Sequence, residues 1–514
     1  MLLPAGCSVF PRGIYYPSLE NRLPQGALAA TAEARKADLA AVAAGQALPP
    51  DAQARLRDAI ARRWAGDDLA RSAREMDPAA GLWVYGDAMQ VVTWLYVEPV
   101  TYGELVVAGL ESLRLALDVP AFRGRFPEAA DDAKRAAFAE ALDILALKAR
   151  AADPAFAFQA ADWLSITIEK NRAMLGLPAG AVVAEFLFGA MDRLDPYTRY
   201  VTPEMLRQED MQMEGTYTGI GAEVAVRDGR LFLAHVFEGG AAAKAGLKPG
   251  DELLAVDGQP VGGPHPLDIL RCLRGKAGTT VRVKIRPGGE GEPKELTLVR
   301  TMVHLPAVRD TQMVDVPRGI GYVRLGQFQG GAERELRQAV AALAKQGAKG
   351  VILDLRGNPG GSLFEAVGVA SLFLAGGRVA ETRGRVLGAT WAYDVPLFSR
   401  PEWRGPLVVL TNEMSASAAE LVAGALAARG RATVVGHRTF GKGAVQIHVP
   451  VNWGASAVCL TIARVYDPKG VCLDGRGVAP EREVAEPAAP PASIKEDPVV
   501  QAAIERLAAG ESKP

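Results

Sequence analysis

Short apolar runs alternate with a helical pattern in the carboxyl-terminal part of the chain. Residues 407–410 are a continuous apolar run of the kind that is typical of a buried strand, and residues 432–436 predict a second buried strand. Between them, residues 418–428 are rich in Ala, Leu and Glu, which favours a helix that Gly430 would end. Residues 444–451 predict a further strand, so this part of the chain reads as strand, helix, strand, strand.

The same alternation begins about a hundred residues earlier. A strand is expected over residues 319–328 and an amphipathic helix over 333–347. Residues 350–363 then begin as a buried strand and enter a glycine-rich turn. Apolar strands joined through helices predict βαβ units and an α/β core.

The amino-terminal part is helical in pattern, and a small β-rich segment follows it. Helical patterns cover residues 51–76, 88–117, 161–175 and 179–195. The last of these ends at Asp195, because the residue before a proline is pushed out of the helical conformation. Residues 215–303 carry alternating strands and turn signals instead.

These patterns predict a multidomain α/β protein in five parts. The parts are a lead-in over 1–50, a helical region over 51–214, a β-domain over 215–303, an α/β core over 304–485, and a linker with a final helix over 486–514. A length of 514 residues is enough for about three domains.

Composition and cysteine spacing exclude several classes of function. The net charge is −1, which gives no sign of a nucleic-acid partner. The cysteines at 7, 272, 459 and 472 have no zinc-site spacing, so neither a metal nor a cofactor is expected. Cys459 and Cys472 could pair as a disulfide, but we expect buried free thiols.

A serine and a lysine lie where they could act together. Ser415 and Ser417 come just before the helix expected at 418–428, and free N–H groups at a helix start favour negative charge. Lys442 lies in a glycine-containing loop with no carboxylate close in sequence, and burial would make its amine neutral. Ser–Lys pairs are a known variant of nucleophilic catalysis. The alternative is a serine that caps the helix and a solvated lysine.

The whole stretch resembles the active-site segment of the carboxyl-terminal processing proteases, also called tail-specific proteases. The matching pieces are SASAAE, GRATVVG and TFGKGAVQ, in order and without gaps. The resemblance implies a core of the ClpP–crotonase type, in which Ser417 is the nucleophile, Lys442 the general base and Gln446 its orienting partner. It also implies an oxyanion hole formed by the turn with Gly360 and Gly361 and by the N–H of Ala418.

Residues 215–303 resemble a PDZ domain. The sequence has GIG followed by a strand, then AGLKPGD and AVDG in order. PDZ domains bind a peptide by strand addition and hold its terminal carboxylate on backbone N–H groups. The resemblance assigns this loop to Gly219, Ile220, Gly221 and Ala222, and an apolar terminal side chain to a groove beside a helix near Leu267–Leu273. The expected partners are therefore proteins or peptides with free C-termini.

The amino-terminal region departs from the family pattern. Residues 88–117 resemble the opening helices of the family, but the motif LDPYTRYVTPEM arrives late, at 194–205. We read a helical insertion over about 120–178, serving assembly, gating or packing alone. Family members often dimerise through these helices, so a homodimer is a candidate assembly, and an adaptor protein is a further candidate partner.

The start of the chain bears on location. MLLPAGC has the small-residue end of a lipoprotein cleavage site, with Cys7 at the lipidation position, yet no basic segment or adequate apolar segment precedes it. Either the true start lies upstream, or Cys7 has no role. No run of 18 apolar residues predicts a membrane helix. Because the family is exported, we expect an extracytoplasmic location, periplasmic or membrane-anchored.

Three functions remain after this reading. The first is a serine endopeptidase that recognises and cleaves C-terminal tails, and the second is an inactive PDZ scaffold that only binds them. The third is a crotonase-like acyl-CoA enzyme, against which the PDZ domain and the Ser–Lys pair argue. Other serine hydrolases are disfavoured, because no GxSxG occurs and His437 and His448 show no sign of a Ser-His-Asp set.

Overall fold

The chain is divided into two compact units in a computed structural model, which describes residues 48–227, 230–261, 272–451, 456–487, 491 and 493–509. One unit is formed by residues 207–307, and the other by the rest of the chain. Helix α10 (Pro203–Met213) spans the boundary between them.

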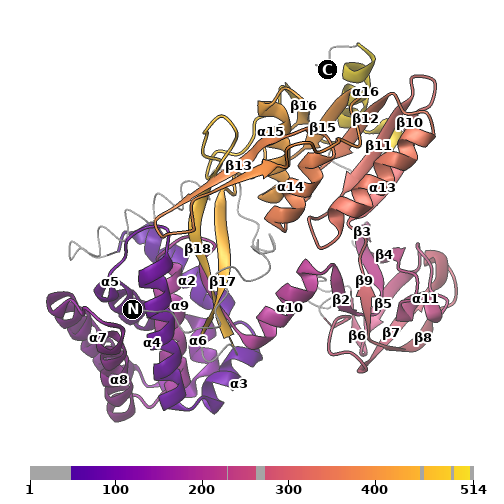
Figure 1. Cartoon of the computed structure of the whole chain (residues 1–514). Coiled ribbons are helices and arrows are strands. Elements are labelled where there is room, and N and C mark those ends of the chain that lie inside the picture. The colour runs from indigo at the N-terminus through magenta and orange to yellow at the C-terminus, as the bar shows by residue number, and fades with distance from the viewer. Residues whose placement is uncertain are drawn as a thin grey trace. The chain divides into compact units, whose positions relative to one another are not determined.

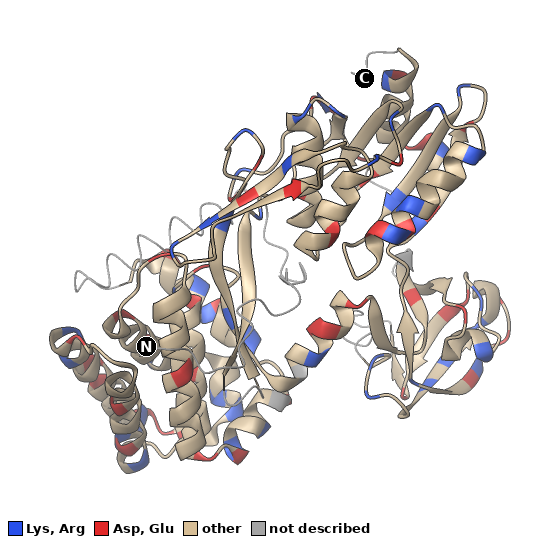
Figure 2. Ribbon diagram, in the orientation of Figure 1, with Lys and Arg blue, Asp and Glu red and all other residues tan. Residues whose placement is uncertain are grey.

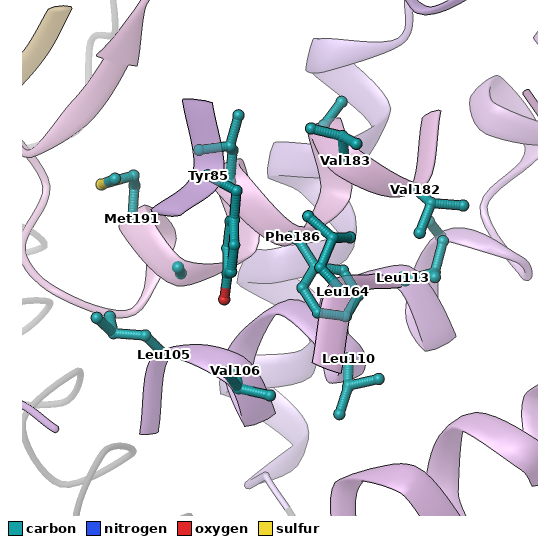
Figure 3. Packing of buried hydrophobic residues seen from close by; sticks show 14 of the residues in the cluster. Tyr85, Leu105, Val106, Leu110, Leu113, Leu164, Val182, Val183, Phe186 and Met191 are labelled. Carbon is teal, nitrogen blue, oxygen red and sulfur yellow. The ribbon is translucent and has the colours of Figure 1, made fainter. Parts of the chain in front are cut away.

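The larger unit begins with a helical region built around an apolar core. Its helices are α2 (Pro50–Arg63), α3 (Asp67–Glu75), α4 (Pro78–Leu95), α5 (Tyr102–Ala116), α6 (Pro120–Arg125), η1 (Pro127–Ala130), α7 (Asp132–Ala152), α8 (Ala157–Met174) and α9 (Ala179–Asp192). In the core, Tyr85 of α4 meets Phe186 of α9 edge-on, with ring centroids 5.7 Å apart, and Leu110 of α5 packs nearby (Figure 3). Helix α9 is buried along most of its length, as its apolar sequence predicts.

The α/β core of this unit is a mixed sheet in the order β10-β11-β12-β15-β16-β19. Its strands are β10 (Val308–Asp315), β11 (Ile320–Leu325), β12 (Gly350–Asp354), β15 (Leu407–Thr411), β16 (Thr433–Gly436) and β19 (Arg482–Glu483). Strands β11, β12, β15 and β16 run parallel, and every residue of β12, β15 and β16 is buried. Continuous apolar runs are therefore needed, because both faces of such a sheet are covered.

Helices connect and cover these strands. They are α13 (Ala332–Lys345), α14 (Leu363–Ser371) and α15 (Ala418–Ala428), and α16 (Pro498–Ala508) ends the described chain (Figure 1). Charged positions of both signs are mixed along α13 (Figure 2), which fits an amphipathic helix with one solvated face. Val499 and Ile504 of α16 join the core that Ile352 and Val408 form on the sheet.

A second sheet links the helical region to the α/β core within the same unit. Its order is β1-β18-β13-β14, with β17 paired to β18. The strands are β1 (Arg199–Val201), β13 (Gly377–Gly384), β14 (Trp391–Val395), β17 (Ala444–Val451) and β18 (Ser456–Tyr466). Strand β1 follows α9 after a short segment and pairs antiparallel with β18, so backbone hydrogen bonds join the helical region to this sheet.

The smaller unit is a β-domain. It holds a sheet in the order β3-β4-β5-β7-β8, with β6 on β5, and a separate pair β2-β9. The elements are β2 (Thr216–Gly219), β3 (Ala222–Arg227), β4 (Arg230–Val236), α11 (Ala241–Lys244), β5 (Glu252–Val256), β6 (Gln259–Pro260), β7 (Thr280–Arg286), η2 (Pro287–Gly289), β8 (Lys294–Val299) and β9 (Thr301–His304). The predicted fold class, a helical region with a β-domain and an α/β core, is confirmed.

Some sequence predictions fall outside the described residues. Cys7 and most of the helix expected near 267–273 are among them. In the described part, Cys272, Cys459 and Cys472 are free thiols. No helix of the described chain has the length and apolarity that a membrane span requires.

Candidate active site

Ser417 lies immediately before α15, at the end of the connection from β15. Its backbone has φ 59° and ψ −116°, a conformation that costs an L-residue about 1–3 kcal/mol. The side chain is 1% exposed, and its Oγ has no hydrogen-bond partner among the described residues. The hydroxyl therefore does not cap the helix, and the fold holds it in a strained, buried position.

Ser415 is bonded quite differently. Its Oγ donates to the carbonyl of Leu355 at 2.8 Å and accepts the N–H of Asn412 at 3.0 Å. The bond with Asn412 closes the turn between β15 and α15, and the bond to Leu355 ties that turn to the end of β12, so this hydroxyl is committed to structure.

Lys442 lies between β16 and β17 and is 2% exposed. Burial lowers the pKa of its ammonium group from 10.5 to about 7, because removal from water disfavours the charged form. Cys459, Glu420 and Asp195 favour the charged form, and Arg199 opposes it, so burial outweighs these neighbours. A large fraction of the amine is therefore neutral near pH 7.

Glu420 of α15 joins the serine and lysine segments. Its Oε2 accepts the backbone N–H groups of Ser417 at 2.7 Å and Lys442 at 2.8 Å. Its Oε1 accepts the N–H of Gly441 at 2.7 Å and the hydroxyl of Thr439 at 2.6 Å. Burial raises the pKa of this carboxyl, and the four donors oppose the rise. No sequence pattern predicted this contact, although one acidic residue in a helix that is otherwise apolar was a usable signal.

The turn after β12 lies directly against Ser417. A Cβ added to Gly360, which has φ +102°, would lie 2.7 Å from the Cβ of Ser417 and 3.0 Å from the nitrogen of Ala418. Only glycine allows this approach. The N–H of Gly360 is already used, since it donates to Asn358 Oδ1 at 2.9 Å.

Gly361 presents a different N–H group. Phe328 donates to the carbonyl of Gly360 at 2.8 Å and accepts from the N–H of Ser362 at 2.8 Å, which makes a parallel bridge opposite Gly361. In such a bridge the central residue turns its own N–H away from the partner strand. Among the described residues of this turn and helix start, Gly361 and Ala418 are therefore the candidate N–H donors to an oxyanion.

Gln446 of β17 is fully buried in the same region. Its Nε2 donates to Thr461 Oγ1 at 3.0 Å, and Thr461 Oγ1 lies 3.0 Å from Asp195 Oδ1. The Nζ of Lys442 lies 5.0 Å from the centre of the Tyr197 ring, two residues after Asp195. The segment after α9 thus contributes to the surroundings of the lysine.

The β-domain contains a groove of about 440 Å³. Ile220 and Ala222, from the predicted carboxylate-binding loop, line it together with Leu273 and Arg274. Gly221 has φ +80°, and a Cβ there would lie 2.8 Å from the Cα of Gly240. The loop is packed closely enough that its centre requires glycine.

Comparisons with known proteins agree with this architecture. The profile of peptidase family S41 matches residues 319–484, and that of the PDZ domain matches residues 234–287. A carboxy-terminal-processing protease of Bartonella bacilliformis is 34% identical over 303 residues, which is 58% of this chain and 68% of that protein. The carboxyl-terminal-processing protease of Synechocystis sp. is 34% identical over 322 residues, 62% of this chain and 74% of that protein.

One further curated relative and one solved structure are also similar to this chain. Carboxy-terminal processing protease CtpA of Bacillus subtilis is 33% identical over 287 residues, 56% of this chain and 60% of that protein. Among solved structures, the photosystem II D1 C-terminal processing protease aligns over 79% of this chain and 93% of that chain, with 27% identity and a TM-score of 0.42.

Proposed function

Since the chain belongs to the carboxyl-terminal processing protease family of serine endopeptidases, we propose that it cleaves protein tails with Ser417 as nucleophile and Lys442 as general base. The observation that supports these roles is the burial of Lys442, whose pKa of about 7 leaves a neutral amine. Glu420 holds the segments of this lysine and of Ser417 together, because its carboxylate accepts the backbone N–H of both residues. Protein and peptide substrates follow from the family and from the PDZ domain.

The proposed reaction proceeds through an acyl-enzyme. The neutral amine of Lys442 takes the proton of Ser417 Oγ while that oxygen attacks the peptide carbonyl. The N–H groups of Ala418 and Gly361 stabilise the oxyanion, and Lys442 then passes the proton to the leaving amine. A water molecule, deprotonated by the same lysine, hydrolyses the ester and restores Ser417.

Two serine variants test the nucleophile. Ser417→Ala should abolish cleavage of an unfolded protein, and Ser415→Ala should retain most of it after allowance for lost stability. Both variants need circular dichroism to show a native fold. An active Ser417→Ala enzyme beside a dead, folded Ser415→Ala enzyme would overturn the assignment, and an unmodified protein that binds tails without cutting them would favour the scaffold.

The PDZ groove is proposed to hold the substrate's C-terminus. Its lining is apolar at Ile220 and Leu273 and cationic at Arg274, which suits an apolar last residue with a free carboxylate. The loop at Gly221 would add backbone N–H donors.

One tail peptide made as free acid and as amide tests this recognition. The free acid should be cleaved faster, and Arg274→Ala or Gly221→Val should remove the difference without changing hydrolysis of a short peptide that bypasses the domain. Arg282→Ala on β7, whose side chain is 60% exposed, is the matched control. Equal cleavage of acid and amide by the unmodified enzyme would mean that the domain does not read chain ends.

Location and assembly are proposals as well. We propose an extracytoplasmic enzyme, because the family resemblance points to export, and a homodimer formed through the amino-terminal helices. Fractionation of cells and light scattering on the purified protein test them. Recovery in the cytoplasm, or a monomer at all concentrations, would contradict the respective proposal.

A further inference from the structure

We propose that Asp195 and Thr461 are positioning residues, which orient the side-chain amide of Gln446 so that its carbonyl oxygen faces the amine of Lys442. The inference rests on the proposed Ser–Lys chemistry and gives a role to the segment after α9. The sequence pattern there indicated only the end of a helix at a proline.

The orientation of the Gln446 amide is determined by the Thr461 hydroxyl, which has a single hydrogen to donate. An ionised carboxylate only accepts hydrogen bonds, so that hydrogen must point to Asp195 Oδ1, which lies 3.0 Å away. The hydroxyl oxygen is then left to accept. It accepts from Gln446 Nε2 at 3.0 Å, and a flipped amide would place two acceptors against each other.

Asp195 is itself held firmly. Its Oδ1 accepts the N–H groups of Tyr197 at 2.8 Å and Thr198 at 3.0 Å, and its Oδ2 accepts the Thr198 hydroxyl at 2.6 Å. The Thr198 hydroxyl oxygen in turn accepts the N–H of Thr461 at 3.1 Å, which closes a ring of bonds between the loop and β18. Asp195 and Thr461 therefore cannot move independently.

The remaining end of the Gln446 amide is its carbonyl oxygen. This atom is buried and has no donor among the described residues. Lys442 shares its surroundings, since Asp195 acts on it electrostatically and its Nζ lies 5.0 Å from the centre of the Tyr197 ring. If the Gln446 carbonyl oxygen is fixed on the side of Lys442, it would accept a hydrogen bond from the lysine amine. That bond would direct the lone pair of the nitrogen to Ser417.

A double-mutant cycle tests whether Thr461 acts through Gln446. Thr461→Val and Gln446→Met should each lower kcat about 10- to 100-fold with little change in KM, since misdirected catalytic groups cost rates of that order. The double variant should be no slower than Gln446→Met alone. Multiplying losses would overturn the proposal. If Thr461→Val does not fold, Thr461→Ala takes its place in the cycle.

Conservative variants separate positioning from packing. Thr461→Ser keeps the hydroxyl and should stay within about threefold of the unmodified enzyme, and Asp195→Asn should do the same because its Oδ1 can still accept. Thr167→Val, a buried threonine of α8 whose hydroxyl bonds its own helix, is the matched control and should be unchanged. Thr461→Ser as slow as Thr461→Val would contradict the proposed role.

The pH dependence of kcat/KM distinguishes lost positioning from loosened packing, because the two effects should shift its acidic midpoint in opposite directions. The charged or titratable groups that act on Lys442 are Cys459 of β18, Arg199 of β1, Glu420 of α15 and Asp195. Loss of an acceptor should shift the acidic midpoint of kcat/KM downward in Thr461→Val, whereas entry of water would shift it upward. An upward shift would count against the proposal. If Lys442→Arg or Ser417→Ala remains active, the proposed function itself fails, so the two failures are distinguishable.

Discussion

Arg356 donates a hydrogen bond of 2.9 Å to Asp497, the residue that caps helix α16. The guanidinium also bonds Asp354 at the end of β12, at 2.7 Å. Arg356 stands just before the turn that carries Gly360 and Gly361, and only 11% of its side chain is exposed. The last helix of the described chain is therefore tied to the turn that faces Ser417.

Asp497→Ala should weaken both the fold and the turn. The variant loses a helix cap and leaves a mostly buried arginine with one partner fewer, which should lower the free energy of unfolding by about 2–3 kcal/mol. Hydrolysis of a short peptide should fall as well, while denaturant unfolding reports the stability. Glu505 lies on the same helix and forms an exposed ion pair with Arg482 of β19. Glu505→Ala should therefore change the free energy of unfolding by less than about 1 kcal/mol. Equal effects of the two variants would contradict this view.

Glu420→Gln should be far more harmful than its size suggests. Both carboxylate oxygens accept two donors each, so the amide nitrogen of glutamine must point at two of them. Leaving those groups unpaired should cost about 2–3 kcal/mol and separate the serine and lysine segments. Unfolding experiments and a peptide assay measure the two effects. A variant with native stability and activity would show that the carboxylate does not join the segments.

The pH dependence should follow Lys442. Because its pKa is lowered to about 7, kcat/KM should rise with pH through a midpoint near 7 and level off above it. Unfolded chains hold this proton up to about pH 10.5, so its contribution to the free energy of unfolding should increase with pH between those values. Lys442→Met should remove that part of the slope. A midpoint near 10 would mean that the lysine is not desolvated.

Gly360→Ala should abolish activity, because its Cβ would lie 2.7 Å from the Cβ of Ser417. Gly347→Ala is the control, since that glycine also has positive φ, +88°, but nothing within 4 Å of an added Cβ. The control should lose only about 1 kcal/mol of stability and keep its peptide hydrolysis. Similar activities of the two variants would argue against a close approach of the turn to the nucleophile.

Ser417→Gly should be more stable than Ser417→Ala, although we expect both to be inactive. Glycine accepts φ 59° and ψ −116° without steric cost, and alanine does not. We expect a difference of about 1 kcal/mol in the free energy of unfolding, after the greater unfolded-state freedom of glycine is subtracted. Alanine as the more stable variant would show that the site stores no backbone strain.

Sequence patterns predicted the elements that depend on neighbouring residues. The continuous run at 407–410 became β15, and the Ala-rich segment that follows became α15, because burial on both faces and helix propensity act locally. The helical pattern at 51–76 gave two helices instead of one. Trp64, with 0% exposure, turns into the core between them, and its Nε1 donates to Glu185 of α9 at 2.6 Å. Tertiary packing decided that break.

Contacts between distant segments could not be predicted. Three of the four bonds of Glu420 come from a loop some twenty residues further on, and the bond from Thr461 to Asp195 spans 266 residues. A single sequence carries no signal of such pairing, since any buried polar residue needs a partner and the pattern does not say which one.

The pairing of β1 with β18 makes the order of synthesis matter. Asp195 leaves the ribosome 266 residues before Thr461, and at about 5–20 residues per second that interval lasts roughly 10–50 s. During this time β18, the strand that pairs with β1 in the folded structure, has not yet been made. The surroundings of Lys442 cannot close until β18 has been made. A nascent chain therefore cannot complete the surroundings of this lysine before β18 has left the ribosome.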